Sequence, residues 1–110
     1  LCCDKVNIYI NAIDQTIINF SFISTGCIIC KASASIMTKE LTNISLENAI
    51  SSIDNVMTGI IKGNLQDDHF SKELITLNRI NKFPSRLKCA LLPWETAVKI
   101  LKKIGKNVVR

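Results

Sequence analysis

The sequence predicts an α+β fold in which a small antiparallel β-sheet, built from one hairpin, packs against several α-helices. Apolar and polar residues alternate over 6–13 and again over 17–23, which is the period of half-buried strands. After residue 28 the apolar residues recur every three or four positions, as on amphipathic helices. The chain has 110 residues, 47% of them hydrophobic. We therefore expect one modest core and a single domain over 1–110.

The two predicted strands are joined at Asp14-Gln15, which is typical of a tight turn. Side chains alternate between the two faces of a strand. We therefore expect Ile18, Phe20 and Phe22 on one face of the second strand, and Ser24–Gly26 to end it.

The helices follow in order. The first is expected from about 28 to 41, and the second begins after Ser45 as N-cap and ends at Gly63. A short helix is expected at 71–77 in a polar segment.

The last helix carries Trp94, Ala97, Val98, Leu101 and Ile104 on one face. Pro93 interrupts it, because proline lacks the backbone donor and clashes with the carbonyl four residues earlier. We expect a kink or a restart near Leu92, with Pro93 in the first turn of the second piece.

The composition favours an intracellular protein. No segment reaches the ~18 uninterrupted apolar residues of a membrane span, and the start lacks the basic and apolar regions of a signal peptide. We therefore expect a cytoplasmic location and no membrane partner. Thiols stay reduced there, so the cysteines point to metal binding or sulfur chemistry rather than to disulfides. There are five of them: Cys2, Cys3, Cys27, Cys30 and Cys89.

Positive charge is concentrated near the end of the chain. Residues 79–110 hold nine Lys or Arg and only Glu95, a net of +8, whereas 1–78 hold five Lys and eight acids, a net of −3. A basic end is one sign of a nucleic-acid arm. These lysines fall on the polar side of a helix with almost no aromatic neighbours, so we interpret them as a solvated face and expect no nucleic-acid partner. A docking surface for an acidic protein is a third interpretation.

Three cysteines occupy positions that can converge at one end of a hairpin covered by helices. Cys2 precedes a predicted strand, Cys27 follows one, and Cys89 falls in the first turn of a predicted helix. A helix N-terminus lowers the pKa of a thiol. Asp4 lies two residues after Cys2, on the same side of an extended chain. Three sulfurs and one carboxylate oxygen complete a tetrahedral zinc site. The alternative is that these cysteines are small core hydrophobes.

Three segments together resemble a known family. They are Leu1-Cys2-Cys3-Asp4, Gly26-Cys27 followed by a helix rich in Ala and Ser, and Arg86-Leu-Lys-Cys89. In this order they are similar to the U-type iron–sulfur cluster assembly proteins (SufU, IscU and the NifU N-terminal domain), over nearly the whole chain. The resemblance is closest to SufU, because Lys88 stands where IscU-type members have histidine. Family members carry a further N-terminal helix, which this chain is expected to lack.

The resemblance implies that Cys2, Asp4, Cys27 and Cys89 hold a zinc ion, or alternatively iron or a 2Fe–2S cluster. It further implies a protein that accepts persulfide sulfur from a PLP-dependent cysteine desulfurase and feeds a downstream Fe–S carrier or apo-protein. Cys2 is the first candidate for the sulfur acceptor and Cys89 the second.

Whether the protein is a zinc-dependent sulfurtransferase or a non-enzymatic scaffold for a 2Fe–2S cluster stays open. A structural zinc module with a nucleic-acid-binding helix is a further alternative. Cys3 replaces the family's glycine and is not assigned as a ligand. Cys30 forms a Cys-x-x-Cys pair with Cys27, and we interpret it as a packing residue rather than a redox partner. A Cys27–Cys30 redox module, with a dithiol potential that does not depend on Cys89, is a further alternative.

Overall fold

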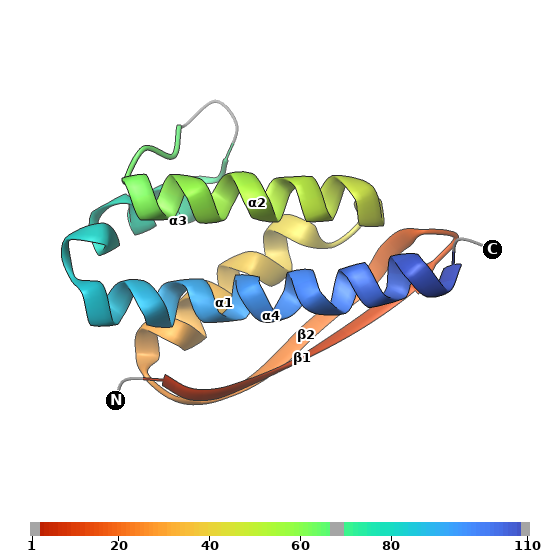
Figure 1. Ribbon diagram of the computed structural model, residues 1–110, viewed down its shortest axis with the longest axis horizontal. Helices are drawn as coiled ribbons and strands as arrows, with labels where there is room; N and C mark the ends of the chain where they lie inside the picture. Colours follow the sequence, from red (N-terminus) through yellow and green to blue (C-terminus); the bar gives the residue numbers. More distant parts are fainter. Residues whose placement is uncertain (1–2, 67–69, 109–110) are drawn as a thin grey trace.

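The computed structural model describes residues 3–66 and 70–108, with side chains over 5–66 and 70–104. Two strands come first along the chain and all the helices follow, which confirms the predicted α+β class (Figure 1). The elements are β1 (Cys3–Ile13), β2 (Thr16–Gly26), α1 (Ile28–Leu41), α2 (Leu46–Lys62), α3 (Lys72–Ile75), the 3₁₀ helix η1 (Thr76–Lys82) and α4 (Pro84–Val108).

The strands β1 and β2 form an antiparallel hairpin with the predicted turn. Asp14 and Gln15 both have positive φ, 51° and 64°. Two central residues with positive φ are typical of the type I′ turn, whose twist matches that of the flanking strands. Asp14-Gln15 achieves this without glycine.

The hairpin corrects the expected position of Ile18. Phe20 is buried and Phe22 half-buried, as predicted, but Ile18 is 44% exposed while Ile17 is fully buried. The register explains the difference, because Asn19 pairs with Asn11 and Ile17 with the next residue of β1, which leaves Ile18 without a partner. Such a β-bulge moves the residues beyond it to the opposite face.

The outer edge of β2 near the bulge is bonded to the connection between α1 and α2. The Ile17 amide donates to the Ile44 carbonyl at 2.8 Å, and the Asn43 amide donates to the Ile17 carbonyl at 2.7 Å. These bonds hold the start of β2 against the helical layer, where the Ile17 side chain joins the core.

Both predicted ends of α2 are confirmed. The Ser45 hydroxyl accepts a hydrogen bond from the Asn48 amide at 3.2 Å, as an N-cap does. Gly63 ends the helix with a φ of 70°, in the left-handed region that favours glycine. A side chain there would also place its Cβ 2.8 Å from the Asn78 carbonyl oxygen.

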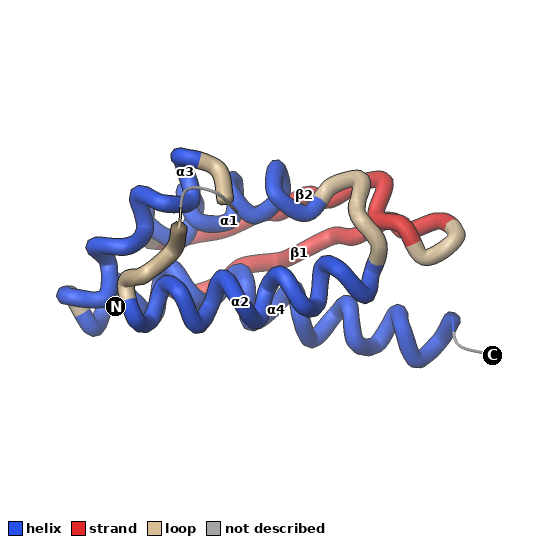
Figure 2. Tube along the Cα trace, turned by 90° about the horizontal axis from the view of Figure 1, so that it is seen from above, coloured by secondary structure: helices blue, strands red, loops and turns tan. Residues whose placement is uncertain are grey.

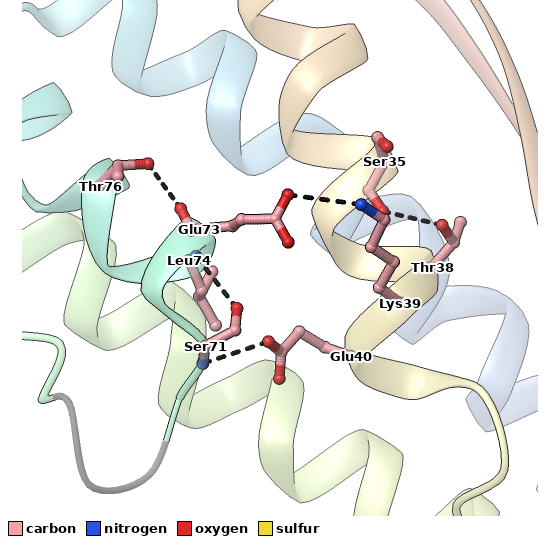
Figure 3. A network of polar contacts seen from close by, with 8 residues as sticks. All are labelled: Ser35, Thr38, Lys39, Glu40, Ser71, Glu73, Leu74 and Thr76. Carbon is pink, nitrogen blue, oxygen red and sulfur yellow. Dashed lines mark hydrogen bonds and ion pairs between the residues drawn. The ribbon is translucent and has the colours of Figure 1, made fainter.

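The predicted short helix at 71–77 is present as α3 followed by η1. Ser71 is its N-cap and accepts from the Leu74 amide at 3.2 Å. Figure 3 shows how this segment is tied to α1: Lys39 forms an ion pair with Glu73 at 3.4 Å, and the Ser71 amide donates to Glu40.

Helix α4 is continuous from Pro84 to Val108, so of the two alternatives expected near Leu92, a kink or a restart, the restart was wrong. Pro93 lies inside the helix and is buried. A proline in a helix interior costs about 3 kcal/mol. The buried face that includes Trp94 and Leu101, both fully buried, offsets this because each large apolar side chain stabilises by about 1.5–3 kcal/mol.

The helices lie on one side of the hairpin, and the core fills the space between them (Figures 1 and 2). Ile8, Ile17 and Phe20 are buried in it together with residues of α1, α2 and α4. Tyr9 and Ile23, on the other face of the hairpin, are more than half exposed. Within the described part of the chain, no helix is long and apolar enough to cross a membrane.

Candidate functional site

The strand register brings the N-terminal cysteine segment next to the second one. Cys3 at the start of β1 pairs with Gly26 at the end of β2, directly before Cys27. A register shift between Cys3 and Lys5 leaves Asp4 as the extra residue of this pairing. Cys2 and the side chain of Asp4 lie outside the described residues. The backbone therefore places segment 3–4 beside Cys27, as convergence at one end of the hairpin requires.

Cys27 lies where the chain passes from strand to helix. Gly26 turns the backbone there with a φ of 105°, which residues with a side chain rarely adopt. Cys27 is the N-cap of α1, with an extended backbone, and its Sγ accepts a hydrogen bond from the Ile29 amide at 3.3 Å. That amide and the positive end of the helix stabilise a thiolate at this position. The predicted helix start at Cys27 is confirmed.

Cys89 is buried, 4% exposed, on α4. Because α4 begins at Pro84, Cys89 falls in its second turn, and the predicted first-turn position was wrong. The effect of a helix terminus fades within the first turn. It therefore does not extend to Cys89, whose place is set by the packing of α4 on α1.

A buried chain of hydrogen bonds joins α1 to α4 next to Cys89. The Ser33 hydroxyl donates to the Ala90 carbonyl at 2.6 Å and accepts from Trp94 Nε1 at 2.9 Å. Ser33 and Trp94 are both fully buried. A buried indole N–H needs a partner, so these bonds tie α1 to α4 at the residue that follows Cys89. We did not predict this pair from the sequence, although a tryptophan opposite an Ala-Ser-rich helix was the available signal.

Cys30 is fully buried in the first turn of α1, as its predicted packing position requires. It precedes Ser33 by three residues, which places the two side chains on one face of the helix. Cys30 of α1 and Cys89 of α4 are therefore both buried, and Cys27 is the N-cap of α1.

The predicted ligand set can be followed only in part. Within the described side chains, no group of three or more His, Cys, Asp and Glu residues is close enough to hold a metal ion. The predicted set needs Cys2 and Asp4, which lie outside that part, so the assignment of Cys2, Asp4, Cys27 and Cys89 stays a prediction.

The remaining polar features lie elsewhere. Arg86 and Lys88, near Cys89 in sequence, are exposed, as are Lys99, Lys102 and Lys103 further along α4. A polar groove runs along α2, lined by residues such as Asn48, Asn55 and Phe70, and no cysteine lines it. None of these residues belongs to the predicted ligand set.

Curated proteins of similar sequence come from several bacteria. The chain is 30% identical over 105 residues to the iron–sulfur cluster assembly scaffold protein IscU of Thermotoga maritima. It is also 30% identical over 108 residues to the zinc-dependent sulfurtransferase SufU of Bacillus subtilis. Each alignment covers 96% of this chain and 73% of the relative.

Solved structures show the same fold. A crystal structure of a candidate SUF-system iron–sulfur cluster assembly scaffold from Fervidobacterium islandicum superposes with a TM-score of 0.77 at 27% identity, over 90% of this chain and 71% of that one. The N-terminal NifU-like protein of Brucella abortus gives a TM-score of 0.77 at 15% identity, over 94% of this chain and 72% of that one. At that identity the second likeness concerns the fold alone.

The model of the NifU-like N-terminal domain matches residues 1–90. This match covers all three cysteine segments, and it agrees with the fold and with both curated relatives. The chain belongs to the NifU-like N-terminal domain family, which includes relatives named IscU and SufU.

Proposed function

We propose that this protein acts in iron–sulfur cluster assembly, accepting persulfide sulfur from a PLP-dependent cysteine desulfurase at a site formed by Cys2, Asp4, Cys27 and Cys89. The observation that carries the proposal is the pairing of Cys3 with Gly26, beside the N-cap Cys27. The names of the two curated relatives, a cluster scaffold and a zinc-dependent sulfurtransferase, support the same chemistry.

The described donors suit a thiophilic metal. Cys27 has its sulfur at a helix N-terminus with an amide donor at 3.3 Å, which favours the deprotonated form that a metal needs. Cys27, Cys89 and Cys2 would supply three thiolates and Asp4 a carboxylate oxygen. Zinc bound to this set would keep the thiolates deprotonated and in place.

The sulfur-accepting step is a thiol exchange. The thiolate of the acceptor cysteine attacks the outer sulfur of the desulfurase persulfide, and the bond between the two donor sulfurs breaks. The acceptor becomes a persulfide and the desulfurase cysteine leaves as a thiolate. Cys2 is the first candidate for the acceptor. Cys89 is the second, and its burial requires that the site open for a partner to reach it.

A cluster scaffold is the second candidate function, favoured by the similarity to the scaffold relative. In that case iron and sulfide are cargo assembled on the same four residues and passed to a carrier or apo-protein. The two functions differ in what the purified protein contains.

The test is elemental analysis of the protein purified without oxygen or added metal. About one zinc per chain, as a closed four-ligand site holds, supports the sulfur acceptor, whereas iron with equal acid-labile sulfide supports the scaffold. Cys2→Ser, Cys27→Ser and Cys89→Ser are each expected to lose the metal. Cys30→Ser, on the same helix as Cys27, is expected to keep it. Equal retention by all four variants would contradict the assigned site.

Sulfur transfer is tested separately with a PLP-dependent cysteine desulfurase and L-cysteine. Alkylation and mass spectrometry of the products locate the added sulfur on one cysteine. Sulfur on Cys2 or Cys89 supports the proposal. A wild-type chain that gains none, although it holds metal, contradicts the acceptor function and leaves the scaffold.

A further inference from the structure

We propose that Cys27 and Cys30 form a redox dithiol at the N-terminus of α1, and that this pair reduces sulfane sulfur carried by Cys27 to hydrosulfide. The inference rests on the proposed function, because sulfane sulfur accepted at Cys2 or Cys89 reaches Cys27 by the same thiol exchange at a stage when no metal holds Cys27. It assigns Cys30 a chemical role beyond packing, and it gives the site an internal source of two electrons.

The first argument is the position of the two residues on the helix. Cys27 is the N-cap and Cys30 is the third residue of α1. In a capping box the side chain at each of these two positions reaches the backbone amide of the other residue. The Cys27 sulfur is folded back over the first turn, where it lies 3.3 Å from the Ile29 nitrogen. A disulfide needs Cβ atoms about 3.5–4.5 Å apart, so closing the pair requires a movement of Cys27, which lies outside the helix.

The second argument is the difference in exposure. Cys27 is partly exposed, whereas Cys30 is fully buried. An external molecule can therefore reach Cys27, whereas the buried Cys30 thiol can attack only its neighbour Cys27. Ile28, between them, is 76% exposed, so the helix start itself is open to a partner.

The third argument is which residue can move. Cys30 belongs to the turn that precedes Ser33, and Ser33 is bonded to both Ala90 and Trp94 of α4. That end of the pair is held by the core. Cys27 has a φ of −67° and a ψ of 136° and lies outside the helix, so it can pivot towards Cys30 without unwinding α1.

The reaction balances without a further oxidant. The Cys30 thiolate attacks Sγ of the Cys27 persulfide, the bond from Sγ to the terminal sulfur breaks, and hydrosulfide leaves. The Cys27–Cys30 disulfide forms. The terminal sulfur is reduced by two electrons and the two thiols are oxidised by two. An external dithiol then reduces the disulfide by exchange at Cys27, the exposed member.

The experiment treats the reduced, metal-free chain with a low-molecular-weight persulfide and follows two products. Hydrosulfide is trapped with bromobimane. The disulfide is detected by alkylation and trypsin cleavage, because residues 6–31 form one peptide that contains Cys27 and Cys30 and no other cysteine. We expect this peptide to lose both alkylation sites and two hydrogens, with one hydrosulfide released per disulfide formed.

Two variants of Cys30 serve as controls. In Cys30→Ser and in Cys30→Ala the persulfide should persist on Cys27. Hydrosulfide release should be slower by at least about tenfold, because the intramolecular attack is lost. Comparing the two variants separates the effect of losing the thiol from the effect of burying a serine hydroxyl. Circular dichroism confirms that each variant is folded.

Equal release by the wild type and both Cys30 variants, or the absence of the Cys27–Cys30 disulfide, would overturn the inference. It fails separately from the proposed function. If the chain accepts desulfurase sulfur and the Cys30 variants behave as the wild type, only the redox pair is wrong. If the pair reduces the small persulfide but the chain takes no sulfur from the desulfurase, the acceptor function is wrong and the dithiol stands.

Discussion

Replacing Ser33 by alanine is expected to lower the free energy of unfolding by about 1.5–4.5 kcal/mol. Ser33 is fully buried and links α1 to α4 through the Ala90 carbonyl at 2.6 Å and Trp94 Nε1 at 2.9 Å. The alanine leaves the indole N–H buried without a partner, which costs about 1–3 kcal/mol. The lost bond to Ala90 adds about 0.5–1.5 kcal/mol. For a domain with a total stability of about 5–15 kcal/mol, this is a large fraction.

The assay is urea unfolding of the reduced, metal-free protein, followed by circular dichroism and by the fluorescence of Trp94, the single tryptophan of the chain. Ser35→Ala is the matched control, because it removes the same atom from a partly exposed position of the same helix. It should change stability by no more than about 0.5 kcal/mol. If Ser33→Ala costs no more than the control, the buried hydrogen bonds do not hold α4 against α1, and the reasoning is refuted.

Four further substitutions test other parts of the fold by the same unfolding assay. Ile17→Ala should cost about 2–5 kcal/mol and Ile18→Ala less than about 1 kcal/mol, because the bulge buries the former and exposes the latter; the reverse order would mean a different register. Gly63→Ala should cost about 1–3 kcal/mol, since alanine is strained at a φ of 70°; a neutral effect would contradict the left-handed cap. Lys39→Ala should cost at most about 1 kcal/mol at low salt and less at high salt, because its ion pair with Glu73 is more than half exposed; a larger, salt-independent loss would show that this pair is a main tie between α1 and α3.

The tertiary structure changed the predictions where packing competes with local preference. Local preference puts a break at Pro93, but the buried face of α4 is continuous through Trp94 and Leu101, and the helix persists. Strict alternation puts Ile18 in the core, but the bonds from Ile17 to the α1–α2 connection favour a bulge that buries Ile17 instead. Neither competing contact is visible in the local sequence, because its partner lies elsewhere in the chain.

The candidate site, too, depends partly on local sequence and partly on tertiary contacts. The sequence by itself determined the fold class, the extent of α1 from about residue 28 to 41 and the ends of α2, because alternation, helical periodicity, N-cap side chains and glycine stops act within a few residues of one another. Only the tertiary structure decided that Cys3 pairs beside Cys27, that Cys30 is buried, and that Ser33 of α1 bonds to the Ala90 carbonyl of α4, next to Cys89. These relations join residues as many as 57 positions apart, and they depend on strand register and helix packing, which no single segment specifies.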